Sequence, residues 1–74
     1  MKSNAVGSIF LIAVMYLPTE AERIEGGKKK IVVEPQFVLA DDIAAATNKA
    51  VMLAAKADAN LDPDRFEVLA TNPF

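Results

Sequence analysis

The longest apolar run in the chain covers residues 9–17, and no polar position interrupts it. A half-buried strand alternates apolar and polar positions, and an amphipathic helix leaves polar gaps every three or four residues. This run does neither, so it predicts a strand, residues 8–17, that is covered on both faces at the centre of a small sheet. Side chains alternate along such a strand, which places the bulkier ones on one face. That bulkier set is Phe10, Ile12, Val14 and Tyr16.

Two more strands and one helix follow this central strand. Residues 30–39 predict a second strand, in which Pro35 indicates an edge position or a bulge because proline cannot donate to a ladder. Residues 41–57 predict the long helix, with Asp41 as its N-cap and an alanine-rich stripe at helical spacing. Residues 65–71 alternate again and predict the third strand.

The charged segment between the first two strands has two interpretations. Thr19 and Glu22 have the spacing of a capping box, which would open a short helical turn that ends at Gly26. The pair Gly26-Gly27 also suits a two-residue hairpin turn with paired arms on either side. We prefer the hairpin, and either arrangement returns the chain antiparallel to the first strand.

The element order β-β-α-β predicts a single α+β domain over residues 1–74. The helix crosses from the second strand to the third, so the first strand fits between them and the sheet order is 2-1-3. One helix covers one face of the sheet and leaves the other open. Because an alanine-rich helix approaches closely, we expect it to cover the slimmer set around Ala13. In the opposite register, the outer face would carry Ile9, Leu11, Met15 and Leu17.

The bulkier set is therefore expected outside, where it would contact another protein chain. The predicted interface consists of Phe10, Ile12, Val14, Tyr16, Leu69 and Phe74.

Composition favours association over catalysis. The chain has 74 residues, of which 53% are hydrophobic, and it has no Cys and no His. A core this small supplies little net stability, so the apolar excess indicates a protein partner. Without His or Cys the commonest general base and the thiolate metal ligands are missing, so we expect no enzyme, cofactor or metal site. The net charge of −2 argues against a nucleic-acid partner, and the apolar run is too short to span a membrane.

A basic tip is the one candidate for ligand binding. Lys28, Lys29 and Lys30 follow the glycine pair, and such a cluster attracts anions. The spacing does not match a phosphate-binding loop, and neighbouring glutamates offset the charge. We interpret the tip as a solvated loop and keep anion binding as the alternative.

Short segments of the chain resemble uncharacterised accessory proteins of tailed bacteriophages. The likeness is carried by IVVEP at 31–35, VLAD at 38–41, FEVL at 66–69 and the ending Pro73-Phe74. It covers roughly the C-terminal two-thirds of the chain, and none of its motifs is specific to an activity. The resemblance implies a viral context, with the protein in the virion or in the host cytoplasm.

The expected function is that of a non-enzymatic structural or assembly protein. It would be an accessory component of the capsid, neck or tail of a phage virion and would associate through its sheet face, with itself or with a larger viral assembly. The alternative is a small homo-oligomeric binding protein that inhibits a host protein or sequesters a small anionic ligand.

Overall fold

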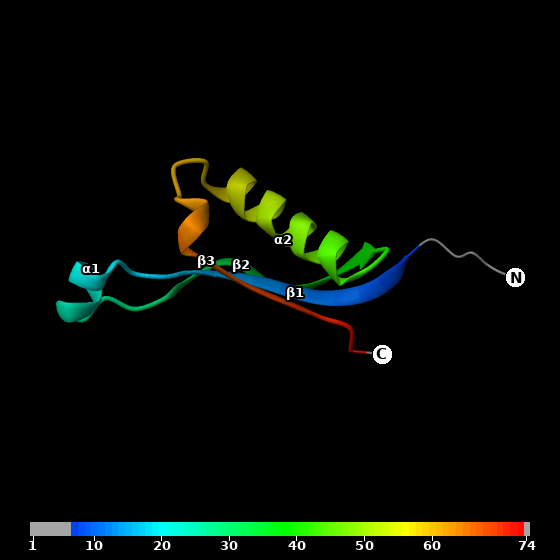
Figure 1. Ribbon diagram of the computed structural model, residues 1–74, viewed down its shortest axis with the longest axis horizontal. Coiled ribbons are helices and arrows are strands. Elements are labelled where there is room, and N and C mark those ends of the chain that lie inside the picture. Colours follow the sequence, from blue (N-terminus) through cyan, green and yellow to red (C-terminus); the bar gives the residue numbers. More distant parts are fainter. Residues whose placement is uncertain (1–6, 74) are drawn as a thin grey trace, which may run out of the picture.

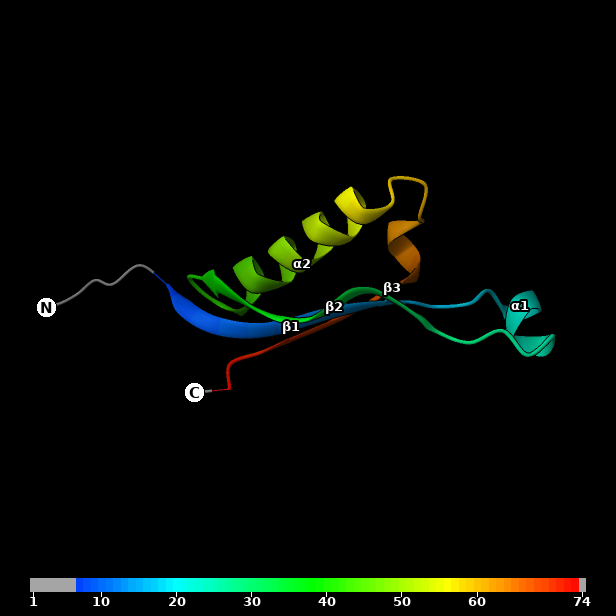
Figure 2. The ribbon, with the colours of Figure 1, turned by 180° about the vertical axis from the view of Figure 1, so that it is seen from behind.

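The computed structural model describes residues 7–73, which form a three-stranded sheet with one long helix. Both outer strands run antiparallel to the central one in the order β2-β1-β3, which confirms the predicted α+β fold. The helix α2 lies over one face of the sheet, and none of the described elements covers the other face (Figures 1 and 2). The elements are β1 (Ser8–Tyr16), α1 (Glu20–Ile24), β2 (Lys30–Ala40), α2 (Ile43–Ala57), the 3-10 helix η1 (Pro63–Arg65) and β3 (Phe66–Thr71).

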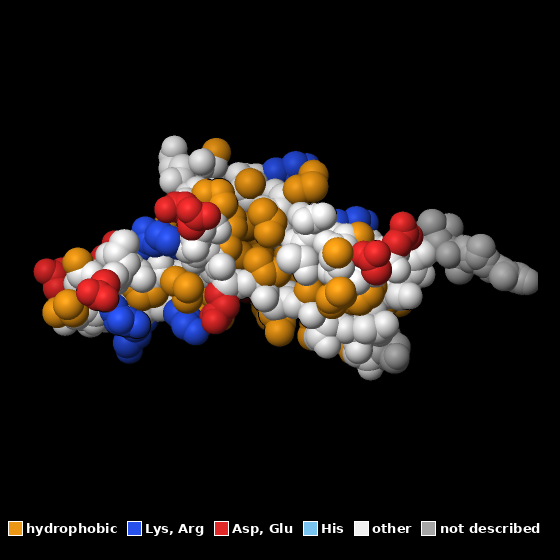
Figure 3. Space-filling view, viewed as in Figure 1, with side chains coloured by type: hydrophobic (Ala, Val, Ile, Leu, Met, Phe, Trp, Pro, Cys, Tyr) orange, Lys and Arg blue, Asp and Glu red, His pale blue; other side chains and the backbone are white. Residues whose placement is uncertain are grey.

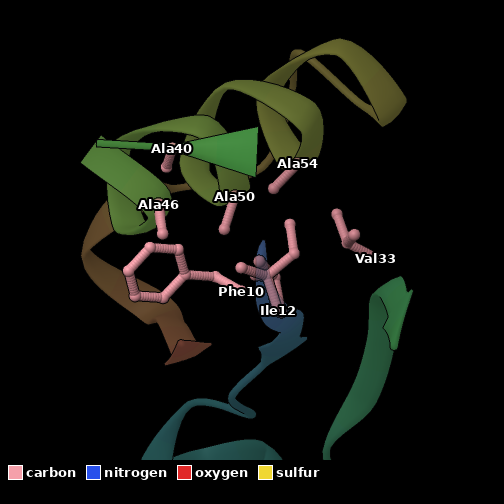
Figure 4. Close-up of a cluster of buried hydrophobic side chains, with 8 residues drawn as sticks. Phe10, Ile12, Val33, Ala40, Ala46, Ala50 and Ala54 are labelled. Atoms are coloured by element: carbon pink, nitrogen blue, oxygen red, sulfur yellow. The ribbon is translucent and has the colours of Figure 1, made fainter. Parts of the chain in front are cut away.

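The core lies between α2 and the sheet, and it joins small helix residues to large strand residues. Ala46, Ala50 and Ala54 are completely buried along one stripe of α2. Figure 4 shows Phe10 and Ile12 of β1 pointing toward these alanines. The buried core consists of Phe10, Ile12, Val14, Val33, Ala40, Ala46, Ala50 and Ala54.

The predicted orientation of β1 is therefore wrong. We expected Phe10, Ile12 and Val14 on the outer face, but they are buried beneath α2. Protein interiors are packed as densely as organic crystals, so the space beside alanine side chains must be filled from the sheet. Large side chains on β1 fill that space, whereas the slimmer set around Ala13 would leave cavities.

The strand β2 is irregular at two points. Its register steps from Ile12↔Gln36 to Val14↔Val33, and then to Met15↔Ile31, so β2 has one extra residue at each step. Pro35 lies within the first step. The position of β2 at one side of the sheet, together with this bulge, confirms the interpretation of that proline.

The preferred hairpin after β1 is wrong, because this segment forms the helix α1. The Glu22 N–H donates to Thr19 Oγ1 at 3.1 Å, and the Thr19 N–H donates to Glu22 Oε1 at 2.8 Å, which completes a capping box. At the other end, the Gly27 N–H donates to the Glu22 carbonyl at 2.7 Å and the Gly26 N–H to the Arg23 carbonyl at 3.0 Å. This is a Schellman ending, with Gly26 at φ 91°. The glycine pair ends a helix and does not turn a hairpin.

The helix α2 begins one residue later than expected. Its N-cap is Asp42, whose Oδ1 accepts the Ala45 N–H at 2.8 Å, so the assignment of Asp41 as the cap is wrong. Its last residue, Ala57, is the predicted one.

Candidate functional site

The face of the sheet opposite α2 is apolar, and we call it the open face. Alternate residues of β1 supply its centre. The strand register places Leu39 opposite Ile9 and Phe37 opposite Leu11, while Leu69 lies opposite Ala13 on the other side. The apolar residues of the open face are Ile9, Leu11, Ala13, Met15, Ile31, Phe37, Leu39 and Leu69. Glu67 and Thr71 of β3 lie on the same face, opposite Met15 and Leu11.

The outer members of this set are exposed to an unusual degree for large apolar side chains. The exposed fraction is 62% for Phe37, 61% for Ile31, 59% for Leu39 and 50% for Leu69. Single exposed apolar residues are normal on proteins, but a contiguous patch of a few hundred Å² marks an interaction site. These side chains lie beside the apolar residues of β1 on the neighbouring strands, so they form a contiguous patch and are not isolated exposed residues.

The open face also contains a hollow. A hollow of about 450 Å³ lies near the centre of the sheet, where Ala13 is small and β2 bulges. Its one acidic side chain, Glu67, accepts a hydrogen bond from Lys29 Nζ at 2.8 Å, so its charge is balanced within the chain. The hollow is lined by Ala13, Met15, Ile31, Pro35, Glu67, Val68 and Leu69.

The structure places the predicted interface residues in different environments. Phe10, Ile12 and Val14 belong to the core and are not available to a partner. Leu69 lies on the open face, as expected from its position in β3. Phe74 lies outside the described residues.

Tyr16, which was also predicted on the outer face, instead packs against residues at the start of β3. Its ring packs edge-on to Phe66, with the ring centroids 5.9 Å apart, and the Arg65 guanidinium lies 4.3 Å from its centroid. Its hydroxyl accepts the Asp62 N–H at 2.9 Å. Tyr16 therefore ties the start of β3 to the end of β1.

Sequence reasoning missed the contribution of β2 to the open face. Ile31, Phe37 and Leu39 follow one another on a strand whose bulges shift the alternation. Strict period-two counting puts these three on one face, but it adds Val33, which the two bulges turn into the core. The usable signal was the proline, which indicated that the alternation would break there.

One lysine of the lysine tip is paired within the chain, and the other two line a mixed surface hollow. Lys29 pairs with Glu67, while Lys28 and Lys30 line a hollow of about 350 Å³ that also contains Glu22 and Glu25. Within this hollow Arg65 pairs with Glu22, so cationic and anionic side chains share its lining. Such a mixed lining is typical of a solvated surface and not of an anion site.

One ion pair at this end of the molecule links α1 to β3. Arg65 Nη2 donates to Glu22 Oε1 at 2.8 Å. The hydrogen bond from the Thr19 N–H lowers the pKa of the Glu22 carboxyl, and the positive charge of Arg65 lowers it further.

The described residues offer no cluster of three side chains suited to a metal ion, and none of their helices is long and apolar enough to cross a membrane. No protein-family model, curated protein or solved structure matches the chain.

Proposed function

We propose that this protein is a non-enzymatic assembly subunit that packs its open face against the open face of a second copy. The observation that supports this proposal is the continuous apolar surface opposite α2. The proposed setting is an accessory component of a phage virion. That setting rests on the resemblance carried by residues 31–35, 38–41 and 66–69.

The chemistry of the open face suits an identical partner. Its charged neighbour Glu67 is already paired with Lys29, so two copies meet without an unpaired carboxylate between them. Phe37 and Leu39 are exposed along β2, and the hollow beside Ala13 lies on the same face. One copy therefore offers both large exposed side chains and a recess. Two sheets that pack face to face lie about 10 Å apart and interdigitate such side chains.

The small core gives this contact a role in stability. Within residues 7–73, only Ile12 and Val14 are large side chains that are fully buried in a single copy, and half of the buried core is alanine. Covering several hundred Å² of apolar surface, at about 25 cal/mol per Å², contributes on the order of 10 kcal/mol before the costs of association. The second copy thus supplies the apolar cover that one helix cannot.

The test is sedimentation of the full chain over a wide range of concentrations. We expect the wild type to associate and Leu39→Lys to lower the mass of the assembly, because a lysine would be buried without a partner. The matched control is Ile24→Lys, at a position on α1 that is 80% exposed and distant from the open face. A wild type that stays monomeric at high concentration, or a Leu39→Lys variant with unchanged mass, would contradict the proposal.

The virion setting has its own test. Mass spectrometry of purified phage particles is expected to detect the chain in more than trace amounts. Its absence from particles, together with normal self-association, would remove the setting and leave the face contact in place.

A further inference from the structure

The two outer edges of the sheet are protected to different degrees. The edge of β2 contains Pro35 and two bulges, which interrupt any ladder that another strand would form there. The edge of β3 has the sequence FEVLAT, with no proline, glycine or lysine. Proline, lysine and bulges are devices that natural sheets use to block strand pairing, and β3 has none of the three; its one charged side chain, Glu67, is paired with Lys29.

The main chain of β3 directs hydrogen-bonding groups away from β1. The Leu17 N–H donates to the Arg65 carbonyl at 2.8 Å, so the main-chain groups of Arg65 point toward β1. In an antiparallel pair this direction alternates from residue to residue. The N–H and C=O groups of Val68 and Ala70 therefore point outward. Phe66 fits the same alternation, because its N–H donates to the Pro63 carbonyl instead of to β1.

We propose that β3 pairs antiparallel with β3 of a second copy across a two-fold axis at Val68, which joins the two sheets into one of six strands. In this register Val68 lies opposite Val68, and Phe66 lies opposite Ala70 on both sides of the axis. The outward groups then form about four main-chain hydrogen bonds, since the Phe66 N–H is already occupied.

The side chains of β3 match themselves in this register. On the α2 side a large Phe66 meets a small Ala70 twice, and all three residues facing α2 are half-buried in one copy. On the open-face side Glu67 lies opposite Leu69, so the two carboxylates are not direct neighbours, and each is paired with Lys29. The register thus places neither like charges nor two bulky side chains opposite each other.

The flank of α2 beside β3 continues this apolar surface. Lys49, Met52 and Leu53 line a hollow with Gln36 and Val38 of β2, which fixes the orientation of the helix. Helical periodicity then directs Val51, which is half-buried, toward the β3 side. Figure 3 shows hydrophobic side chains gathered in the middle of the molecule between α2 and the sheet. A second copy at β3 would place its own helix on the same side of the joined sheet.

This edge contact uses different atoms from the open face, so each contact is tested without the other. The chain has no cysteine, and Val68→Cys introduces one at the proposed axis. Opposed Cα atoms of a hydrogen-bonded pair lie about 5.5 Å apart, within the range of a disulfide. The matched control is Ala70→Cys, which also lies on the α2 side; its two copies would be four residues apart along the strands, about 13 Å or more, beyond that range.

Mild oxidation is expected to link Val68→Cys into a dimer roughly tenfold faster than Ala70→Cys. The same preference is expected when Leu39→Lys is added to both variants, because that lysine disturbs only the open face. Equal cross-linking of the two cysteine variants would overturn the proposal.

A second measurement uses the unaltered chain, so it does not depend on how the cysteine variants fold. Hydrogen exchange at the Val68 and Ala70 amides is expected to slow as protein concentration rises. Fast exchange at these two amides in a fully associated sample would also overturn the proposal.

Discussion

The side chain of Ile12 links the central strand to the alanine stripe of α2, and it is completely buried. Ile12→Ala would leave a cavity that small neighbours cannot fill, so we expect a loss of about 2–5 kcal/mol of unfolding free energy. The total free energy of unfolding of a domain of this size is only about 3–5 kcal/mol. Thermal unfolding followed by circular dichroism is expected to show a greatly lowered melting temperature. Ile24→Ala, at an exposed position, is the control that should melt like the wild type, and equal melting of both variants would contradict the assignment of the core.

Single residues also explain why the orientation of β1 could not be read from the chain. Both sets of alternate positions in β1 are apolar, so the pattern itself does not choose between them. The choice depends on the volume that Ala46 and Ala50 leave between helix and sheet, which is a property of the packed core. Large residues facing alanine on the opposing element are the better guide to a buried face.

Among the elements, α1 depends on the charge of Glu22. The pKa of this carboxyl is lowered in the folded chain, first by the hydrogen bond from the Thr19 N–H and then by Arg65. A lowered folded pKa means that its stabilising effect is present above the unfolded value and is lost as pH falls through the folded value. We therefore expect acid to open α1.

The measurement is a pH titration of the Thr19 amide by NMR, with an expected midpoint below the ordinary pKa of glutamate, about 4.3. Glu22→Gln is the control, since glutamine also completes a capping box but does not titrate. A midpoint at or above the ordinary value would show that the capping interaction does not hold the carboxylate.

The lysine tip between α1 and β2 is expected to matter little for folding. Lys29 and Glu67 are each about half exposed, and exposed ion pairs contribute about 0–1 kcal/mol. Replacing Lys28, Lys29 and Lys30 by Gln should leave the melting temperature nearly unchanged in differential scanning calorimetry. Isothermal titration with inorganic phosphate should show no binding to the wild type. Heat of binding that the triple variant lacks would favour an anion site instead.

The strands and α2 could be predicted because their signals are local. Alternation, alanine content and Pro35 each act within a few residues, and the bounds of β1 and β3 differ from prediction by one residue at one end. The segment at α1 was assigned wrongly because Gly26-Gly27 serves equally in a hairpin turn and in a helix ending. The two hydrogen bonds between Thr19 and Glu22 favour the helix over the hairpin. This capping box was the less preferred of the two interpretations of the sequence.

For the whole molecule, the sheet order followed from chain order alone, since a helical crossover makes β2 and β3 parallel and leaves room for β1 between them. The surface that remains open did not follow from it. The open face depends on which side of β1 the helix selects and on the bulges of β2. Neither is fixed by the order of elements.

Two different two-fold contacts on one small subunit lead to a closed assembly or an extended array. The face contact relates one pair of copies and the β3 edge contact relates another, and perpendicular axes that meet close into a tetramer. Because each copy buries only a small core by itself, folding and association are coupled.

The melting temperature of the wild type is therefore expected to rise steadily over an approximately hundredfold range of protein concentration, since mass action favours the associated folded state. Leu39→Lys should retain a shallower dependence, because the edge contact remains while the face contact is lost. Ile24→Lys should keep the full dependence, as its position touches neither contact. A wild-type melting temperature that does not change with concentration would show that a single copy is stable by itself and would contradict this coupling.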